Sequence, residues 1–153
     1  MNYVKYFITL ILSIYITNLS SLFYDDGIYQ INKLEYSYSN GYGMNQDVSY
    51  KIDCEDDCVL YIKEYEKSED DLIKIKLSSK NMDEFENILN KCHVLSWRGF
   101  SKSDPTVLDG DSFSFRLRYN DDEKLSASGY MMYPDYYSKF QKEFEEYVSS
   151  LKK

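Results

Sequence analysis

The amino-acid sequence predicts an α+β domain: an antiparallel sheet with two amphipathic helices packed on one face, preceded by an N-terminal apolar segment. Residues 112–119 alternate between polar and apolar side chains, which is the period of a half-buried strand. Residues 81–92 and 134–151 instead carry apolar side chains at helical spacing. Strand-like runs precede each of these two segments, so the predicted order is strands, helix, strands, helix.

The composition limits the classes of protein to which this chain can belong. The chain of 153 residues is 43% hydrophobic, and since domains hold roughly 100–200 residues, we expect one domain with one substantial core. Its 17 Tyr and 8 Phe favour strands, because aromatic rings suit a pleated, half-buried surface. The net charge of −8, from 26 acidic and 18 basic side chains, opposes attraction to phosphate backbones and anionic lipids. We therefore expect no nucleic-acid partner.

Residues 1–21 have the layout of a secretory signal peptide. Lys5 and the amino terminus supply positive charge, Tyr6–Thr17 is an apolar run of twelve residues, and Asn18–Ser21 adds small polar residues. The uncharged span Tyr6–Tyr24 reaches nineteen residues, about the length of a bilayer crossing, so a retained membrane anchor is an alternative. A buried N-terminal element of a cytosolic domain is the third interpretation.

The composition becomes polar and aromatic near residue 25, so the predicted folded domain spans 25–153. Any membrane contact is expected through the N-terminal segment alone. The expected location is the cell envelope or the exterior, with membrane-anchored or cytoplasmic protein as alternatives.

Two strands and a turn are predicted at the start of the domain. Ile28–Ser39 is a long strand with alternate residues on one face, and Asn40–Gly43 is a turn whose glycines tolerate positive φ. Val48–Cys54 is a second alternating strand, with Val48, Tyr50 and Ile52 on the same face as Cys54.

A hairpin is predicted around the acidic loop Glu55–Asp57, which leads into the strand Cys58–Tyr65. A three-residue loop places apolar residues opposite apolar ones: Cys58 opposite Cys54, Leu60 opposite Ile52, and Ile62 opposite Tyr50. In an exported protein this register favours a disulfide between Cys54 and Cys58, with Cys92 buried and free. In the cytosol all three cysteines would be small hydrophobic residues.

The first helix is predicted after a short strand, Leu72–Leu77. Asn81 is the expected N-cap, with Glu84 three residues later as in a capping box. The apolar stripe of this helix consists of Met82, Phe85, Ile88, Leu89 and Cys92.

A second hairpin joins Ser112–Tyr119 to Lys124–Met132 through a turn at Asn120–Glu123. The inward residues are expected to be Phe113, Phe115, Leu117 and Tyr119 on one strand, and Leu125, Ala127, Gly129 and Met131 on the other. Trp97 is expected to pack across the sheet.

The second helix is predicted from Pro134 to Leu151. Pro134 suits the first turn, and Asp135 lies beside the positive end of the helix dipole. The expected apolar face consists of Tyr136, Phe140, Phe144, Tyr147, Val148 and Leu151.

No pattern predicts a metal, a cofactor or a catalytic residue. Cys92 and His93 are neighbours that diverge by about 100° on a helix, so they neither share one ion with Cys54 and Cys58 nor form a nucleophile and base pair. The acidic clusters at residues 55–57, 69–71 and 121–123 lack the spacing of a calcium loop and are typical of solvated turns.

The C-terminal third resembles a recurring pattern in small proteins of gut-dwelling anaerobic bacteria. The matching segments are Trp97–Phe100, with Gly99, then Val107–Ser114, with Leu108, Asp109 and Gly110, and finally Ser126–Pro134, with the run Ser128, Gly129, Tyr130 and Met131. That family has no assigned activity. The resemblance therefore implies a bacterial source and a stable fold unit, and no chemistry.

The leading functional hypothesis is a non-enzymatic, exported or membrane-tethered domain that binds a protein or glycan partner through a Tyr-rich sheet surface. The expected partner surface consists of Ser114, Arg116, Arg118, Ser128 and Tyr130. One alternative is a small hydrolase whose carboxylates come from separate turns. The other is a cytosolic acidic inhibitor or immunity-type protein that caps a basic site on a partner.

Overall fold

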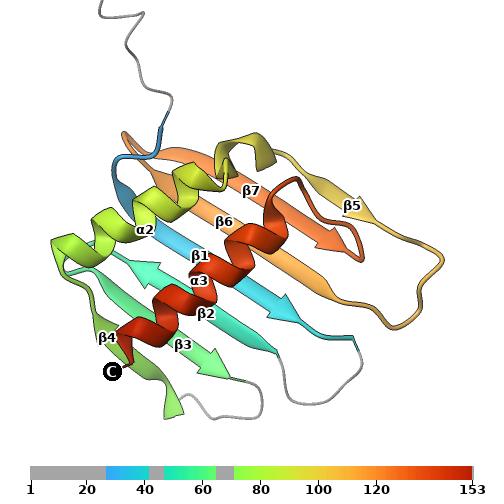
Figure 1. The fold of residues 1–153 in the computed structure, drawn as a ribbon, viewed down its shortest axis with the longest axis horizontal. Coiled ribbons are helices and arrows are strands. Elements are labelled where there is room, and N and C mark those ends of the chain that lie inside the picture. The colour runs from blue at the N-terminus through green and yellow to red at the C-terminus, as the bar shows by residue number, and fades with distance from the viewer. Residues whose placement is uncertain (1–26, 42–46, 65–70, 153) are drawn as a thin grey trace, which may run out of the picture.

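The computed structural model describes residues 27–41, 47–64 and 71–152. They form a seven-stranded, mostly antiparallel sheet with two long helices on one face, which confirms the predicted α+β class (Figure 1). The predicted signal or anchor at 1–21, the second half of the turn at 40–43 and most of the acidic cluster at 69–71 lie outside the described residues.

The strand order across the sheet is β4-β3-β2-β1-β6-β7-β5, so β1 and β6 meet at the centre. Every neighbouring pair is antiparallel except β5 and β7, which are parallel. The strands are β1 (Ile31–Ser39), β2 (Val48–Asp53), β3 (Val59–Glu64), β4 (Ile73–Lys76), β5 (Ser101–Ser103), β6 (Ser112–Tyr119) and β7 (Glu123–Tyr130). The helices are α2 (Ser79–Lys91), the 3₁₀ helix η2 (Val94–Trp97) and α3 (Tyr137–Leu151).

The register of the β2–β3 hairpin is as predicted. Ile52 lies opposite Leu60, and Tyr50 lies opposite Ile62, so apolar side chains pair across the two strands. Cys54 and Cys58 flank the loop and are joined by a disulfide, while Cys92 is free and fully buried.

The β6–β7 hairpin also pairs as predicted, with Phe115 opposite Ala127, but β7 ends at Tyr130. Met131 was expected on the inward face and is instead 39% exposed. Its φ of 56° breaks the alternation, and its backbone N–H donates to the carbonyl of Asp111 at 2.9 Å. The chain leaves the sheet so sharply that the carbonyl of Met132 leaves no room for a side chain at Gly129.

The predicted stripe of α2 is buried in full, but the predicted cap is wrong. Ser78 is the N-cap: its Oγ accepts from the backbone N–H of Asn81 at 3.2 Å, and Asn81 Oδ1 accepts from the N–H of Ser78 at 3.0 Å. Both residues are good cap formers, and their reciprocal bonds add a turn before the predicted start.

Helix α3 begins at Tyr137, three residues later than predicted. Tyr136 has φ 62° and is 53% exposed, so its expected place on the apolar face is wrong, and Tyr137 is buried instead. Two bonds fix this entry: Trp97 Nε1 donates to the carbonyl of Asp135 at 2.9 Å, and the hydroxyls of Tyr137 and Tyr36 are 3.0 Å apart. Phe140, Phe144, Tyr147 and Val148 are buried as predicted, and Leu151 packs partly exposed against the core.

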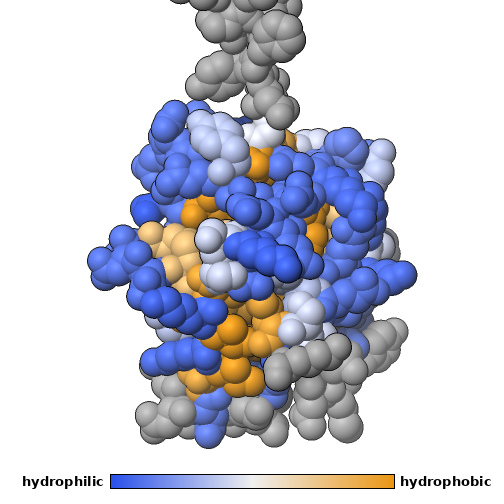
Figure 2. Space-filling model, turned by 60° about the vertical axis from the view of Figure 1, so that its left-hand side comes forward, coloured by the Kyte–Doolittle hydropathy of each residue, from blue (hydrophilic) through white to orange (hydrophobic). Residues whose placement is uncertain are grey.

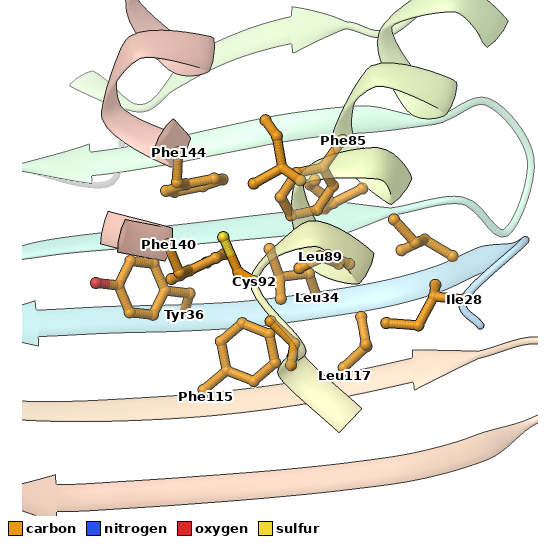
Figure 3. Close-up of a cluster of buried hydrophobic side chains, with 14 of the residues drawn as sticks. Ile28, Leu34, Tyr36, Phe85, Leu89, Cys92, Phe115, Leu117, Phe140 and Phe144 are labelled. Atoms are coloured by element: carbon orange, nitrogen blue, oxygen red, sulfur yellow. The ribbon is translucent and has the colours of Figure 1, made fainter. Parts of the chain in front are cut away.

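The core lies between the helix layer and the sheet and is rich in aromatic rings (Figure 3). Trp97 is fully buried, with edge-to-face contacts to Phe115 at 5.4 Å and Phe140 at 5.3 Å between ring centroids. Phe140 also stacks on Phe144 at 5.4 Å. Such pairs stabilise a core beyond the area they bury.

The edge near β4 is less completely covered. Ile73 and Ile75 of β4 pack against the core but remain partly exposed. Seen from that side, hydrophilic residues cover most of the surface and leave a hydrophobic area open (Figure 2).

Two elements, η2 and β5, were not predicted. Strand β5 has only three residues, all polar and exposed, so it gives no periodic signal. It is held by backbone bonds: the N–H of Ser128 donates to the carbonyl of Phe100 at 2.8 Å, and the N–H of Gly99 donates to the carbonyl of Ser126 at 3.0 Å.

Candidate functional site

The sheet has a second face, away from the helices, which we call the open face. On β6 the core takes Phe113, Phe115 and Leu117, so the side chains between them point to the open face. The five residues predicted as a partner surface all lie there: Ser114, Arg116 and Arg118 from β6, and Ser128 and Tyr130 from β7. The structure therefore brings together every member of the predicted set.

The open face is strongly basic, although the protein as a whole is acidic. Among the described residues, register and alternation place eight basic side chains on its strands but only two acidic ones, Glu35 and Asp53. The basic side chains are Lys33, Lys51, Lys63, Lys74, Lys76, Arg116, Arg118 and Lys124. The other acidic side chains that the structure describes lie on other surfaces and in turns, and two of them, Asp57 and Asp122, pair with Lys76 and Arg118 of the open face.

Both carboxylates of the open face contact its cations. Glu35 lies 2.7 Å from Lys33 Nζ and 3.5 Å from Arg116 Nη1, and Asp53 lies 2.7 Å from Lys51 Nζ. The hydrogen bond from Lys33 lowers the pKa of Glu35, and that from Lys51 lowers the pKa of Asp53. Both groups stay ionised at neutral pH, and the cations still outnumber them.

One transverse row of side chains holds the densest charge, and we call it the charged row. Strand register aligns its members directly across five strands: Lys74, Tyr61, Lys51, Glu35 and Arg116. The Lys51 and Lys74 ammonium groups lie 5.5 Å and 5.8 Å from the ring centroid of Tyr61, within cation–π range. Arg116 is 71% exposed at the end of this row.

The adjacent transverse row consists of serines, and we call it the serine row. Its members are in register on five neighbouring strands: Ser49, Ser37, Ser114, Ser128 and Ser101. Lys63 lies opposite Ser49 and ends the row on β3. The hydroxyls of Ser128 and Ser101 are 3.5 Å apart.

The serine row forms a trench, because small side chains lie beside a row of long ones. A hollow of ≈ 550 Å³ is lined by Ser37, Ser49 and Ser114 together with Lys51, Tyr61 and Arg116 of the charged row. A second hollow of ≈ 410 Å³ shares the same three serines and extends to Ser39 and Ser112 on the other side. The trench thus crosses the central strands of the sheet.

The predicted residues differ in their place relative to the trench. Ser114 and Ser128 belong to the serine row, and Arg116 lies on the wall. Arg118 lies one row further out, where it pairs with Asp122 at 3.1 Å. Tyr130 lies at the far rim, and its hydroxyl donates to the carbonyl of Leu108 at 2.8 Å.

Sequence reasoning missed most of the surface contributed by the N-terminal strands, above all Ser37, Ser49, Lys51 and Tyr61. A signal for it exists in the sequence. Serines recur two residues apart in four segments that become strands: 37 and 39, 101 and 103, 112 and 114, and 126 and 128. Each pair has the period of a strand, so both serines point to the same face.

The described residues offer little for catalysis or metal binding. Within residues 27–41, 47–64 and 71–152, no group of three His, Cys, Asp or Glu side chains is arranged to hold a metal ion. Burial raises the pKa of the Cys92 thiol, which opposes formation of a thiolate, whereas His93 is exposed and packs on the ring of Tyr136 at 4.8 Å.

Among the helices of residues 27–41, 47–64 and 71–152, none combines the length and apolar content that a bilayer span requires.

No protein-family model matches the chain, and no curated protein matches it. The resemblance of residues 97–134 to small proteins of gut anaerobes stays a prediction, and function must be argued from the geometry of the open face.

Proposed function

We propose that this protein is a non-enzymatic binding domain, exported or membrane-tethered, that takes an anionic protein or glycan partner on its open face. The observation that carries the proposal is the segregation of charge: eight cations against two carboxylates on one sheet face of a chain with net charge −8. Complementary potentials speed encounter and select partners.

Solubility alone does not account for this distribution. A solvated surface is best served by interspersed charges of both signs, and like charges on neighbouring strands repel each other. Arg118 lies directly opposite Lys33 and Lys124 in the ladder, so three cations adjoin in one row. Lys33 pairs with Glu35 at 2.7 Å and Arg118 pairs with Asp122 at 3.1 Å, which offsets part of this repulsion, and the cations of the face still outnumber these carboxylates.

The observations favour neither alternative function. A general acid needs a raised pKa, and the pKa values of Glu35 and Asp53, the carboxylates of the open face, are lowered by their ion pairs. Burial raises the pKa of Glu86, which lies on α2 and not on the open face. An acidic inhibitor would bind through a carboxylate-rich surface, whereas the charge segregated on the open face is positive.

The test compares two double variants, each of which loses two positive charges. Lys51→Ala with Arg116→Ala removes two cations from the open face, and Lys80→Ala with Lys142→Ala removes two exposed cations from the helices. Acidic protein and acidic glycan fractions of a host extract are passed over each immobilised protein. The open-face pair is expected to lose capture of the bound fraction, and the helix pair to retain it.

Both pairs must melt within a few degrees of the unsubstituted protein for the comparison to hold. Equal capture by both would show that the open face is not the binding surface.

A further inference from the structure

The trench has a direction. Its serine hydroxyls follow one another across the strands, at the interstrand spacing of about 4.7–4.9 Å, rather than along any one strand. Rows on either side lie two residues away along the strands, roughly 7 Å. The charged row walls the trench on one side, and on the other side the trench opens onto a second row of small side chains, Ser39 and Ser112. It fits an extended chain lying perpendicular to the strands.

The trench also has a defined chemistry. Each serine hydroxyl both donates and accepts a hydrogen bond, so the floor suits a ligand that carries hydroxyls along its length. Lys51 and Arg116 stand on one wall and Lys63 at one end, so anionic groups on the ligand would meet donors that bear charge.

We propose that the trench binds a single chain of an anionic polysaccharide, one that carries carboxylate or sulfate groups, laid across the strands. This inference rests on the proposed function and specifies its partner. Sugar hydroxyls exchange hydrogen bonds with the serine row, and the acidic groups pair with Arg116 and Lys51.

An acidic peptide fits the trench less well. The backbone N–H and C=O groups beneath the serine row are used within the sheet, so a crossing peptide would find no backbone partners.

A nucleic-acid duplex fits it less well too. A duplex spans several rows, and Glu35 in the charged row and Asp47 at the rim would then face its phosphates. A single polysaccharide chain in the trench contacts fewer rows, and its acidic groups can lie beside Lys51 and Arg116 while its hydroxyls lie beside Glu35.

The experiment uses the full chain and probes of defined chemistry. Binding to polygalacturonate and to heparin is measured by calorimetry, with neutral dextran, poly-L-glutamate and duplex DNA as comparisons. Binding is expected for one or both anionic polysaccharides, weakening as salt is raised, because exposed charges are screened. Dextran should not bind, and poly-L-glutamate and DNA should bind at least tenfold more weakly.

Serine substitutions test how much the trench contributes to binding, separately from the charges around it. Ser114→Leu fills the trench without changing charge, and Ser149→Leu, on the exposed side of α3, is the matched control. We expect about tenfold weaker polysaccharide binding for the first and no change for the second. Ser128→Leu repeats the test at an exposed position of the same row, should Ser114→Leu fold poorly.

One further substitution is expected to tighten polysaccharide binding. Glu35→Gln removes a carboxylate from the wall, so we expect about threefold tighter binding, the size of a modest surface charge effect.

The outcomes distinguish this inference from the function on which it rests. Binding of poly-L-glutamate or DNA equal to that of the polysaccharides, or binding unchanged by Ser114→Leu and Ser128→Leu, overturns the polysaccharide trench while leaving the open face as a partner surface. Failure of every anionic probe overturns the inference as well. If the double substitution Arg116→Ala with Lys51→Ala left all binding unchanged, both the polysaccharide inference and the proposed function would be overturned.

Discussion

The two faces of this sheet are built from the same strands and have opposite compositions. On β6, Phe113, Phe115 and Leu117 enter a core packed by two helices, whereas Ser114 and Arg116, between them, meet solvent. Packing dictates the covered face, because any polar group there would need a buried partner. No such demand acts on the open face, so its serine and charged rows need a different explanation, and the one we propose is partner binding.

The largest expected difference between the faces is in stability. Phe115→Ala should lower the free energy of unfolding by about 3–5 kcal/mol, because it opens a cavity among aromatic rings. Arg116→Ala, its neighbour on the open face, should change it by less than about 1 kcal/mol. Denaturant unfolding measures both, and similar losses would mean that the open face is structural.

Alkaline titration tests the covered face next. Burial raises the pKa values of Tyr36 and Tyr137 above the ordinary value, so the folded protein keeps protons that the unfolded chain releases near pH 10. Stability present below that pH should therefore fall steadily as the pH rises above about 10. Tyrosinate absorbance and circular dichroism, followed together, should show these rings ionising only as the protein unfolds.

The control for that titration is the double substitution Tyr36→Phe with Tyr137→Phe. It removes both hydroxyls of the buried pair at once and should flatten the alkaline decline. Ionisation of every tyrosine with the fold intact would contradict the packing of Tyr36 beneath α3.

The pairing of the cysteines tests the placement of the β2–β3 hairpin and of α2. We expect Cys54 and Cys58 to oxidise together and Cys92 to stay reduced, as the observed pairing implies. Mass mapping of the oxidised protein decides the pairing. Replacing both Cys54 and Cys58 by Ser should cost about 2 kcal/mol on the chain-entropy model for so short a loop. A bridge that includes Cys92 would show that the β2–β3 hairpin or α2 is misplaced.

The smallest effect is expected from removing residues 1–21. If this segment is a signal or an anchor, a chain that begins at Leu22 should keep its far-ultraviolet spectrum and its cooperative melt. Loss of cooperativity would instead support the buried-element interpretation, and would make the segment part of the covered side of the molecule.

Sequence periodicity predicts which face a residue takes, and it did so well here. The alternation of Ser112–Tyr119 placed Arg116 and Arg118 correctly away from the helices, and apolar pairing gave the β2–β3 register. Helix starts were harder, because Ser78 and Asn81 compete as caps and the left-handed backbone at Tyr136 leaves no mark in the pattern.

The trench was beyond the reach of periodicity, because it depends on which strands are neighbours. Glu35 meets Arg116, and Ser37 meets Ser114, only because β1 pairs with β6, far away in the chain. A net charge of −8 also concealed a basic surface, since it averages over faces that the fold keeps apart.

The two edges of the sheet affect how readily the protein aggregates. Its two edge strands, β4 and β5, have four and three residues, so each exposes only a few unpaired backbone groups. Lys74 and Lys76 stand along β4, and Lys102 stands on β5, where a strand from another molecule would have to desolvate them. Edge-to-edge aggregation is thereby resisted, and under the proposed polysaccharide binding several copies could lie along one polymer while each sheet remains separate.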